Sequence, residues 1–305
     1  MPYFLRVVGQ TQPDQVWEVT DREATRLGVG NPAHGPGTHF AAGEGEDVWA
    51  TMRRHTPWFE NGANPFHPLE LEPRTYHPRM ARPISFSRQK YMLSPSVEVE
   101  SRALALGIGQ ALALTRRLDL ICQTVNPAPE TLAVYGHEIR NLLILAATEV
   151  ETHWRGVLVV NGTTRERLTT AHYARLLRPM RLAEYAVSLP SFPWLPCVEP
   201  FREWHPQNPT TSLPWYDAYN AAKHDREGAF GRATLGHAIS AVCAGVVMLV
   251  AQFTRSAGLG GRGELSAYYR MDRVPAWDPS EVYSDLGGDV RTWTPVQHGD
   301  LVIAR

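Results

Sequence analysis

An almost uninterrupted apolar stretch, residues 238–251, constrains the fold of this chain more than any other segment. At about 14 residues it is shorter than the roughly 20 needed to cross a bilayer, and the polar His237 and Gln252 border it. A helix that is apolar on nearly every side needs protein contacts all around it. The pattern over residues 232–254 therefore predicts a buried central helix, and we expect no contact with a membrane.

Two long amphipathic segments on either side of a proline turn predict a pair of antiparallel helices. The first covers residues 96–125 and the second covers residues 130–157. The expected apolar face of the first helix consists of Leu104, Ile108, Leu112 and either Leu118 or Leu120. Residues 126–129, Asn-Pro-Ala-Pro, separate the two helices because proline does not continue a helix. With a third helix from Pro214 and the central helix, these segments predict a mainly α fold.

The remaining parts of the chain lack long helical patterns. Residues 3–8 predict a strand and residues 47–54 a short helix, but prolines recur throughout residues 57–83 and exclude a long helix there. We expect a proline-rich N-terminal region over residues 1–95 that is irregular or partly β, a helical region over residues 96–257, and a glycine-rich loop with a tail of short strands over residues 258–305.

An insertion of about residues 160–212 is expected to interrupt the helical region. Residues 170–177 predict a short helix, and residues 182–189 and 197–204 look extended with prolines between them. This spacing predicts a small hairpin-like insertion.

The composition excludes several classes of protein. The 305 residues are 43% apolar and 20% charged, which is a globular balance, and a net charge of −1 argues against a broadly basic surface. Three widely separated cysteines and the lack of a signal peptide predict free thiols in the cytoplasm. The histidines of the N-terminal region match no familiar ligand spacing, and the glycines of residues 258–263 lack a preceding strand, so we expect neither metal nor cofactor.

The densest group of polar side chains lies near the end of the third predicted helix. Residues three and four apart share a helix face, so Asn220, Lys223 and His224 are expected to project together, with Tyr219 and Arg226 beside them. An amide, an ammonium, an imidazole and a guanidinium gathered next to a core helix indicate a candidate site.

Lys223 adds weight to this interpretation. The chain contains 30 basic residues, of which only Lys90 and Lys223 are lysines. Where arginine serves as the generic cation, a lysine can be required for its compact and mobile ammonium. The alternative is that two lysines remained by chance.

Residues of two predicted helices resemble those of a known family. The matching motifs are Tyr135-x-His137-x-Ile139-Arg140-x-Leu142-Leu143, Thr148-Glu149-Val150-Glu151 and Tyr219-Asn220-x-x-Lys223-His224-x-Arg226. They resemble an uncharacterised bacterial family that is itself similar to the HEPN superfamily, the "higher eukaryotes and prokaryotes nucleotide-binding" domains. The resemblance covers roughly residues 96–257.

The resemblance implies a four- or five-helix bundle that acts on RNA. Many HEPN proteins are metal-independent endoribonucleases of toxin–antitoxin and other defence systems, whereas others bind without catalysis. The active family motif consists of an arginine, then four to six intervening residues, then a histidine. Counting back from His224 reaches Tyr219, Ala218 and Asp217 instead, so Lys223 would have to supply positive charge together with Arg226.

The residue types in the cluster suit cleavage of RNA without a metal. An imidazole titrates near neutral pH, so His224 can move protons as acid or base. Lys223 and Arg226 can hold a phosphate that Asn220 orients. Pairing of two bundles across a two-fold axis would double the positive charge, so we expect a homodimer through the helical bundle with RNA as a partner.

The same cluster has an architectural alternative. Its side chains can form a buried polar network with Glu149 of the second helix, which fixes how the two helices meet. His137 and Glu138, at the start of that helix, can also approach it and would support the cluster with Tyr219. The protein would then be a non-catalytic binding or scaffold bundle. Exposure of His224 to solvent in a cleft favours the catalytic hypothesis.

Overall fold

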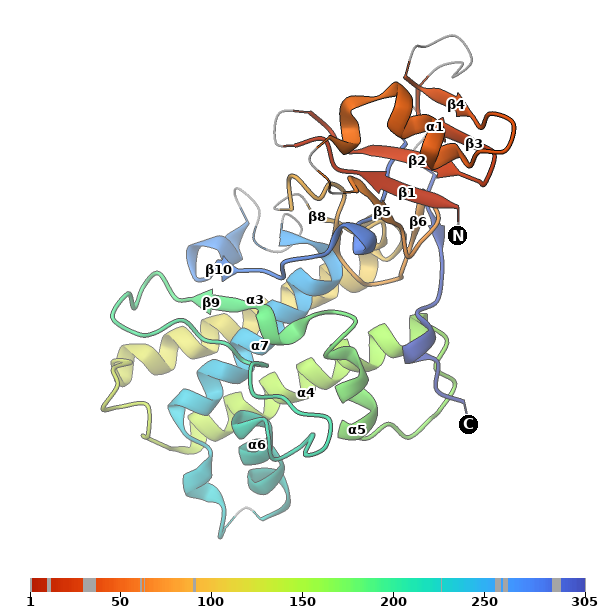
Figure 1. The fold of residues 1–305 in the computed structure, drawn as a ribbon. Helices are drawn as coiled ribbons and strands as arrows, with labels where there is room; N and C mark the ends of the chain where they lie inside the picture. Colours follow the sequence, from red (N-terminus) through yellow and green to blue (C-terminus); the bar gives the residue numbers. More distant parts are fainter. Residues whose placement is uncertain are drawn as a thin grey trace. The chain divides into compact units, whose positions relative to one another are not determined.

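The computed structural model describes residues 2–9, 12–29, 37–60, 62, 64–89, 92–225, 227–255, 259, 263–286 and 292–304. Of these residues, 42% are helical and 13% lie in strands, and five of the strands form one antiparallel sheet (Figure 1). The prediction of a mainly α fold is therefore wrong, and the chain is a mixed α/β protein. The sheet was missed because strands of three to five residues between turns carry little periodicity.

The chain forms two compact units, and both draw on the end of the sequence. Unit 1 consists of Met1–Tyr76, Arg82–Leu93 and Ala276–Val296. Unit 2 consists of His77–Ala81, Ser94–Pro275 and Gln297–Arg305. Each unit is described separately below.

Unit 1 is built on the five-stranded antiparallel sheet, whose strand order is β4-β3-β2-β1-β5. The strands are β1 (Tyr3–Arg6), β2 (Gln15–Val19), β3 (Glu23–Arg26), β4 (His39–Ala41) and β5 (Phe66–Pro68). In the β1–β2 pair, Tyr3 lies opposite Glu18 and Arg6 opposite Gln15. Strand β1 confirms the strand predicted at the N-terminus, in a shorter form.

Helix α1 (Val48–His55) packs against this sheet through an aromatic core. Asp47 caps the helix, because its carboxylate accepts a hydrogen bond from the Ala50 N–H at 2.7 Å. Trp17 of β2 is fully buried and touches the rings of Phe40 and Phe66. The smaller elements of unit 1 are η2 (Pro57–Phe59), the antiparallel pair β7 (Arg82–Pro83) and β8 (Met92–Leu93), the parallel pair β6 (Thr75–Tyr76) and β11 (Thr294–Pro295), and η7 (Pro279–Glu281).

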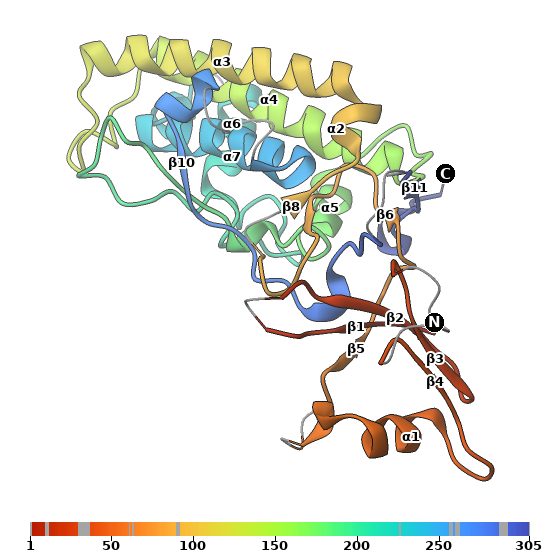
Figure 2. The ribbon, with the colours of Figure 1, turned by 90° about the horizontal axis from the view of Figure 1, so that it is seen from above.

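Unit 2 is the helical part of the chain. Its α-helices are α2 (Ser96–Val99), α3 (Ser101–Thr124), α4 (His137–Val160), α5 (Thr170–Tyr173), α6 (Pro214–His224) and α7 (Leu235–Phe253). Helix α3 runs along α4, and α7 packs against α3, α4 and α6 (Figure 2). The long helices confirm the segments predicted from periodicity, although α4 begins at His137 and not near residue 130. Single turns of 3₁₀ helix are η3 (Ala174–Leu176), η4 (Leu182–Glu184), η5 (Phe230–Arg232), η6 (Glu264–Ala267) and η8 (Gly299–Leu301).

Helix α7 is the centre of unit 2, as its sequence predicts. Every residue of the helix except Gly236, His237 and Ser240 is buried, and the Thr234 side chain caps its first turn. Among the described helices, α7 is the one that is long and apolar enough to span a membrane, but 83% of its apolar window is buried inside the protein. Such a helix is the ordinary core of a globular unit, so it gives little support to a membrane span.

The insertion between α4 and α6 pairs differently from the predicted hairpin. Strand β9 (Ala186–Ser188) forms an antiparallel pair with β10 (Arg270–Arg273), which lies far along the chain (Figure 1). The segment that was expected to complete the hairpin contributes the isolated bridge between Val187 and Val198. Short strands were expected in the C-terminal tail, but pairing between distant segments leaves no local pattern, and for this reason the pairing of β10 with β9 was not predicted.

Candidate functional site

Helix α6 carries the polar cluster and is anchored in unit 2 by an apolar face. Pro214 occupies its first turn, where a fixed φ and a missing N–H favour the start of a helix. The buried residues are Trp215, Tyr216, Ala218, Tyr219 and Ala222. The helix ends at His224, so its last turn presents polar side chains at the surface.

The structure separates the residues of the predicted cluster by their exposure. Lys223 and His224 are exposed, Asn220 is half-buried and Tyr219 is fully buried. The Asn220 side chain donates a hydrogen bond of 3.1 Å to the carbonyl oxygen one turn earlier, so its amide is engaged within α6. Among the described residues, no hydrogen bond or ion pair engages the His224 imidazole. Arg226 lies outside the residues that the structure describes.

A series of polar contacts connects Lys223 with helix α4. Lys223 Nζ donates to Tyr219 Oη at 2.9 Å and lies 5.1 Å from the centre of that ring. The rings of Tyr219 and Tyr216 are 5.4 Å apart, and Tyr216 Oη donates to a Glu151 carboxylate oxygen. The hydrogen bond to Tyr219 raises the pKa of Lys223, and the charge of Glu151 raises it further against the opposing effect of burial. Lys223 is therefore a cation at neutral pH.

The acid that reaches α6 is Glu151, although the sequence pointed to Glu149. The Glu149 carboxylate lies 3.5 Å from the Nε2 atom of His153, four residues later on α4, and burial raises its pKa. In the architectural alternative Glu149 could pair with Lys223 or Arg226; its pairing with Lys223 is not formed, and Arg226 lies outside the described residues.

His137 and Glu138 begin α4 and are both exposed. The His137 ring lies 4.9 Å from the ring of Phe230, and the Arg140 guanidinium lies 5.4 Å from the same ring. Phe230 belongs to η5, which follows α6 in the chain. The structure therefore brings His137 next to the segment after the cluster, while Glu138 has no described hydrogen bond or ion pair.

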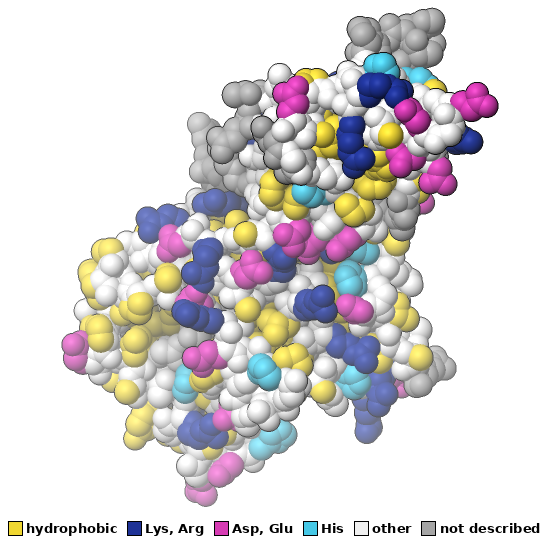
Figure 3. All heavy atoms as spheres, viewed as in Figure 1, with side chains coloured by type: hydrophobic (Ala, Val, Ile, Leu, Met, Phe, Trp, Pro, Cys, Tyr) yellow, Lys and Arg dark blue, Asp and Glu magenta, His cyan; other side chains and the backbone are white. Residues whose placement is uncertain are grey.

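A second polar feature of unit 2 was missed by the sequence analysis. Residues 155–178 contain five arginines and one glutamate, and all five arginines are exposed. We call them the arginine surface: Arg155, Arg165, Arg167, Arg175 and Arg178. Figure 3 shows basic side chains over the part of unit 2 that contains α5. The excess of cations in this short stretch was a signal that the near-zero net charge of the whole chain concealed.

Two residues of the arginine surface, Arg165 and Arg175, act on His172. Burial lowers the pKa of His172, and the charges of Arg165 and Arg175 lower it further. Arg175 and Arg178 also line a hollow of about 550 Å³. This part of unit 2 is therefore suited to a group that carries negative charge.

Tyr173 of α5 is buried among residues of α4 and α6. Its ring lies 5.2 Å from that of Trp154. Burial raises the pKa of Tyr173, Glu151 and Tyr219 raise it further, and Arg155 lowers it. The arginine surface and the α6 cluster both belong to unit 2.

Comparison with protein-family models, with curated proteins and with solved structures finds no match. Within the described part of the chain, no group of three or more His, Cys, Asp or Glu residues is placed to hold a metal ion. The groups that the geometry does offer are an accessible imidazole and an accessible ammonium on the last turn of α6, with an arginine-rich surface in the same unit. These groups can transfer a proton and bind an anion.

Proposed function

We propose that this protein is a cytoplasmic, RNA-acting effector of a bacterial defence or toxin system, with a HEPN-like helical unit. In this proposal His224 acts as the proton-transfer group and Lys223 stabilises negative charge on a phosphate, with Asn220 and Arg226 beside them. The observation that carries the proposal is the exposure of Lys223 and His224 on the last turn of α6, in the same unit as the arginine surface.

The proposed reaction needs only groups that this chain supplies. A neutral His224 imidazole accepts the proton of an RNA 2′-hydroxyl, whose oxygen attacks the adjacent phosphorus. The bond to the 5′-oxygen breaks, and that oxygen takes up the proton, leaving a 2′,3′-cyclic phosphate and a 5′-hydroxyl. The Lys223 ammonium stabilises the charge that develops on the phosphate oxygens. The proton returns to the RNA, so His224 ends the reaction neutral.

The arginine surface supports RNA as the substrate class. Arginine binds phosphate oxygens through a planar fork of donors, so a run of exposed arginines suits a repeating phosphate backbone. The net charge of −1 means that attraction is confined to this part of the chain. Binding is therefore expected to weaken as the salt concentration rises.

Removal of the His224 imidazole is expected to abolish cleavage while leaving RNA binding intact. His224→Ala should slow cleavage of a labelled single-stranded RNA by about 100-fold, because positioned general acid–base groups typically contribute 10²–10⁴-fold. The matched control is His205→Ala, because His205 is also an exposed histidine of unit 2. Gel analysis of cleavage products and fluorescence anisotropy of uncleaved RNA measure the two activities. Equal cleavage by the folded wild type and His224→Ala would remove His224 from the reaction.

The proposal includes a homodimer formed through the helical unit. On α3, Leu106 and Leu120 are 65% and 62% exposed. Exposed small residues near Leu106 are Ala105, Gly109 and Ala113. No charged residue occurs between Arg102 and Arg116, so the part of the helix around Leu106 is suited to contact with a second copy, whereas Arg116 and Arg117 lie between it and Leu120.

A single charge on this face of α3 is expected to dissociate the dimer. Leu106→Glu should halve the mass measured by light scattering at micromolar concentration, because burying the carboxylate at an apolar contact is costly. Ser101→Glu is the control, because Ser101 is exposed at the start of the same helix. A wild-type protein of monomeric mass would contradict the dimer.

A non-catalytic scaffold is the second candidate function, and one observation favours it. Asn220 binds a carbonyl of its own helix, and Lys223 binds Tyr219, so two of the cluster's polar groups already have partners. Both contacts lie within α6, and in a scaffold the hydrogen bond from Tyr216 Oη to Glu151 would fix this helix against α4. The cleavage experiment separates the two functions, because a scaffold leaves RNA intact with or without His224.

A further inference from the structure

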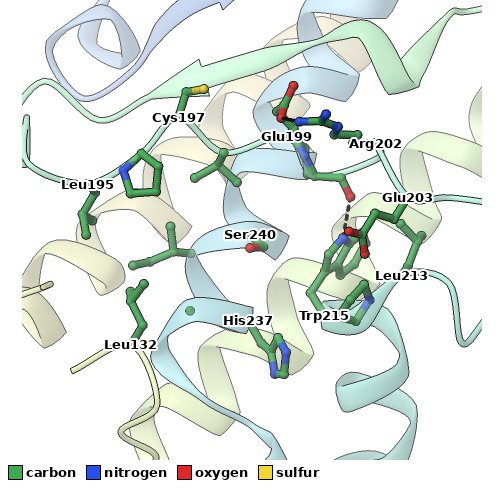
Figure 4. A pocket seen from close by; sticks show the side chains of 16 residues that line it. Leu132, Leu195, Cys197, Glu199, Arg202, Glu203, Leu213, Trp215, His237 and Ser240 are labelled. Carbon is green, nitrogen blue, oxygen red and sulfur yellow. Dashed lines mark hydrogen bonds and ion pairs between the residues drawn. The ribbon is translucent and has the colours of Figure 1, made fainter. Parts of the chain in front are cut away.

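A hollow of about 560 Å³ lies in unit 2 at the beginning of α6, away from the helix end that carries Lys223 and His224. Residues 195–203 of the insertion, the first residues of α6, the first turns of α7 and Leu132 line it. Figure 4 shows Ser240 of α7 in the middle of the hollow, between Leu132 and Leu195 on one side and Glu203 on the other. Its volume is in the range of sites for small molecules.

The walls of the hollow are apolar and are fixed by hydrogen bonds. The indole N–H of Trp215 donates to the Pro200 carbonyl at 2.9 Å, so this side chain presents no free donor. The Gly236 N–H donates to the Leu132 carbonyl at 2.9 Å, which ties the loop before α4 to the start of α7. A Cβ at Gly236 would meet that carbonyl oxygen at 3.3 Å, so glycine allows this close approach. The hollow is thus preformed.

One polar group at the floor of the hollow has a defined hydrogen-bonding role. His237 Nδ1 lies 2.8 Å from the Arg232 carbonyl oxygen, which can only accept, so Nδ1 carries the proton. Arg232 is itself held by an ion pair with Asp217. In the neutral ring, Nε2 is then left as an acceptor. Ser240 lies three residues later on the same helix face.

The charges at the rim are largely compensated. The Glu199 side chain is 14% exposed and forms ion pairs with both Arg202 and Arg273. Glu203 is exposed to solvent and needs no partner. A ligand inside the hollow therefore meets no unpaired buried charge, and a neutral molecule avoids the cost of removing an ion from water.

We propose that this hollow binds a neutral, mostly apolar small molecule that carries a hydroxyl group. The hydroxyl donates to His237 Nε2 and can accept from Ser240 Oγ, while the carbon body packs against Leu132, Leu195 and Ile239. A ligand of this class matches the apolar side chains of the lining and the acceptor at His237 Nε2. This site is independent of the proposed action on RNA.

Direct binding of two matched probes tests the site without reference to RNA. The probes are 4-propylphenol and its methyl ether, which differ in the hydroxyl donor and little in shape. By calorimetry the phenol is expected to bind about five- to tenfold more tightly, as one additional hydrogen bond predicts. No saturable binding of the phenol, or equal affinity for the two probes, overturns the proposal.

The location of binding is tested with a conservative variant and a chemical reporter. His237→Asn keeps a donor near the Nδ1 position but removes the Nε2 acceptor, and it is expected to abolish the preference for the phenol. Cys197 lines the hollow and is exposed, whereas Cys122 and Cys243 are buried and burial raises the pKa of both thiols. Bound phenol should slow alkylation of Cys197 by iodoacetamide. A preference that survives in His237→Asn, or an unchanged alkylation rate, places any binding elsewhere and refutes this site.

Discussion

Replacing Trp154 with alanine is expected to lower the free energy of unfolding of unit 2 by about 3–5 kcal/mol. Trp154 lies on α4 and is fully buried. Its aromatic neighbours are Tyr173, Phe201, Trp204, Trp215 and Tyr216, with ring centres 4.8 to 6.2 Å away. Helices α5 and α6 and the insertion all meet this ring, so alanine leaves a cavity between several elements. Urea unfolding followed by circular dichroism measures the loss.

Two control variants separate the cavity from other effects at Trp154. The indole N–H of Trp154 is buried and has no partner among the described residues, so Trp154→Phe removes an unsatisfied donor and should cost much less than alanine. Trp194→Ala alters a side chain that is 53% exposed and should cost about 1 kcal/mol or less. Equal losses at Trp154 and Trp194 would mean that α5, α6 and the insertion do not depend on this ring.

The sequence predicted the long helices of unit 2 and much of the inward face of α3, but not its closest approach to α7. Leu104, Ile108 and Leu112 pack against the core while partly exposed, and of the two further candidates Leu118 is buried and Leu120 is exposed. The burial of Gly107 was not predicted. A Cβ at Gly107 would meet Leu249 Cδ2 at 2.8 Å, so α3 approaches α7 through its smallest residue. A pattern of large apolar residues cannot reveal a contact that depends on a missing side chain.

The failure to predict the sheet of unit 1 was the largest error in the predicted fold, and this failure also has a physical cause. Strand β5 joins the sheet beside β1 after α1 and a proline-rich segment have intervened, so its pairing is non-local. Proline spacing correctly excluded a long helix over residues 57–83 but did not reveal the partner strand. Short strands are defined by pairing more than by their own composition.

Only the part of the candidate site that lies within one helix was predicted from the sequence. Helical spacing placed Lys223 and His224 on one turn, and the structure exposes both. Helical spacing gave no means of telling whether Glu149 or Glu151 reaches α6, because this depends on the rotation of α4 relative to α6. The hollow near His237 is built from segments that are distant in sequence, so it had no local signature either.

A buried histidine is expected to make unit 2 lose stability in mild acid. Burial lowers the pKa of His153 to about 4, and the charge of Arg79 contributes in the same direction. The ring accepts from the Gln252 side chain at 3.0 Å through Nδ1, so Nε2 carries the proton and faces Glu149. The difference from an ordinary pKa of 6.5 corresponds to on the order of 3 kcal/mol of stability at neutral pH.

The sign of this effect follows from proton uptake by the unfolded chain. Between pH 6.5 and about 4, the unfolded state protonates His153 and the folded state does not, so stability is complete above this window and falls as the pH is lowered through it. His153→Asn keeps an acceptor for Gln252 and should flatten the profile measured by urea unfolding from pH 4.5 to 8. Superimposable profiles for wild type and variant would show that the ring is not buried as a neutral base.

Protonation of Glu149 affects the stability of unit 2 in the opposite direction to protonation of His153. A substitution at Glu149 therefore gives a sharper test of the pH dependence. Burial raises the pKa of Glu149, so the folded state takes up its proton at a higher pH than the unfolded chain and gains stability on acidification. Glu149→Gln removes this offset but keeps an acceptor for His153 Nε2, so the acid loss should become steeper than in the wild type. His153→Asn and Glu149→Gln should therefore displace the profile in opposite directions, a result that nonspecific destabilisation of α4 would not produce.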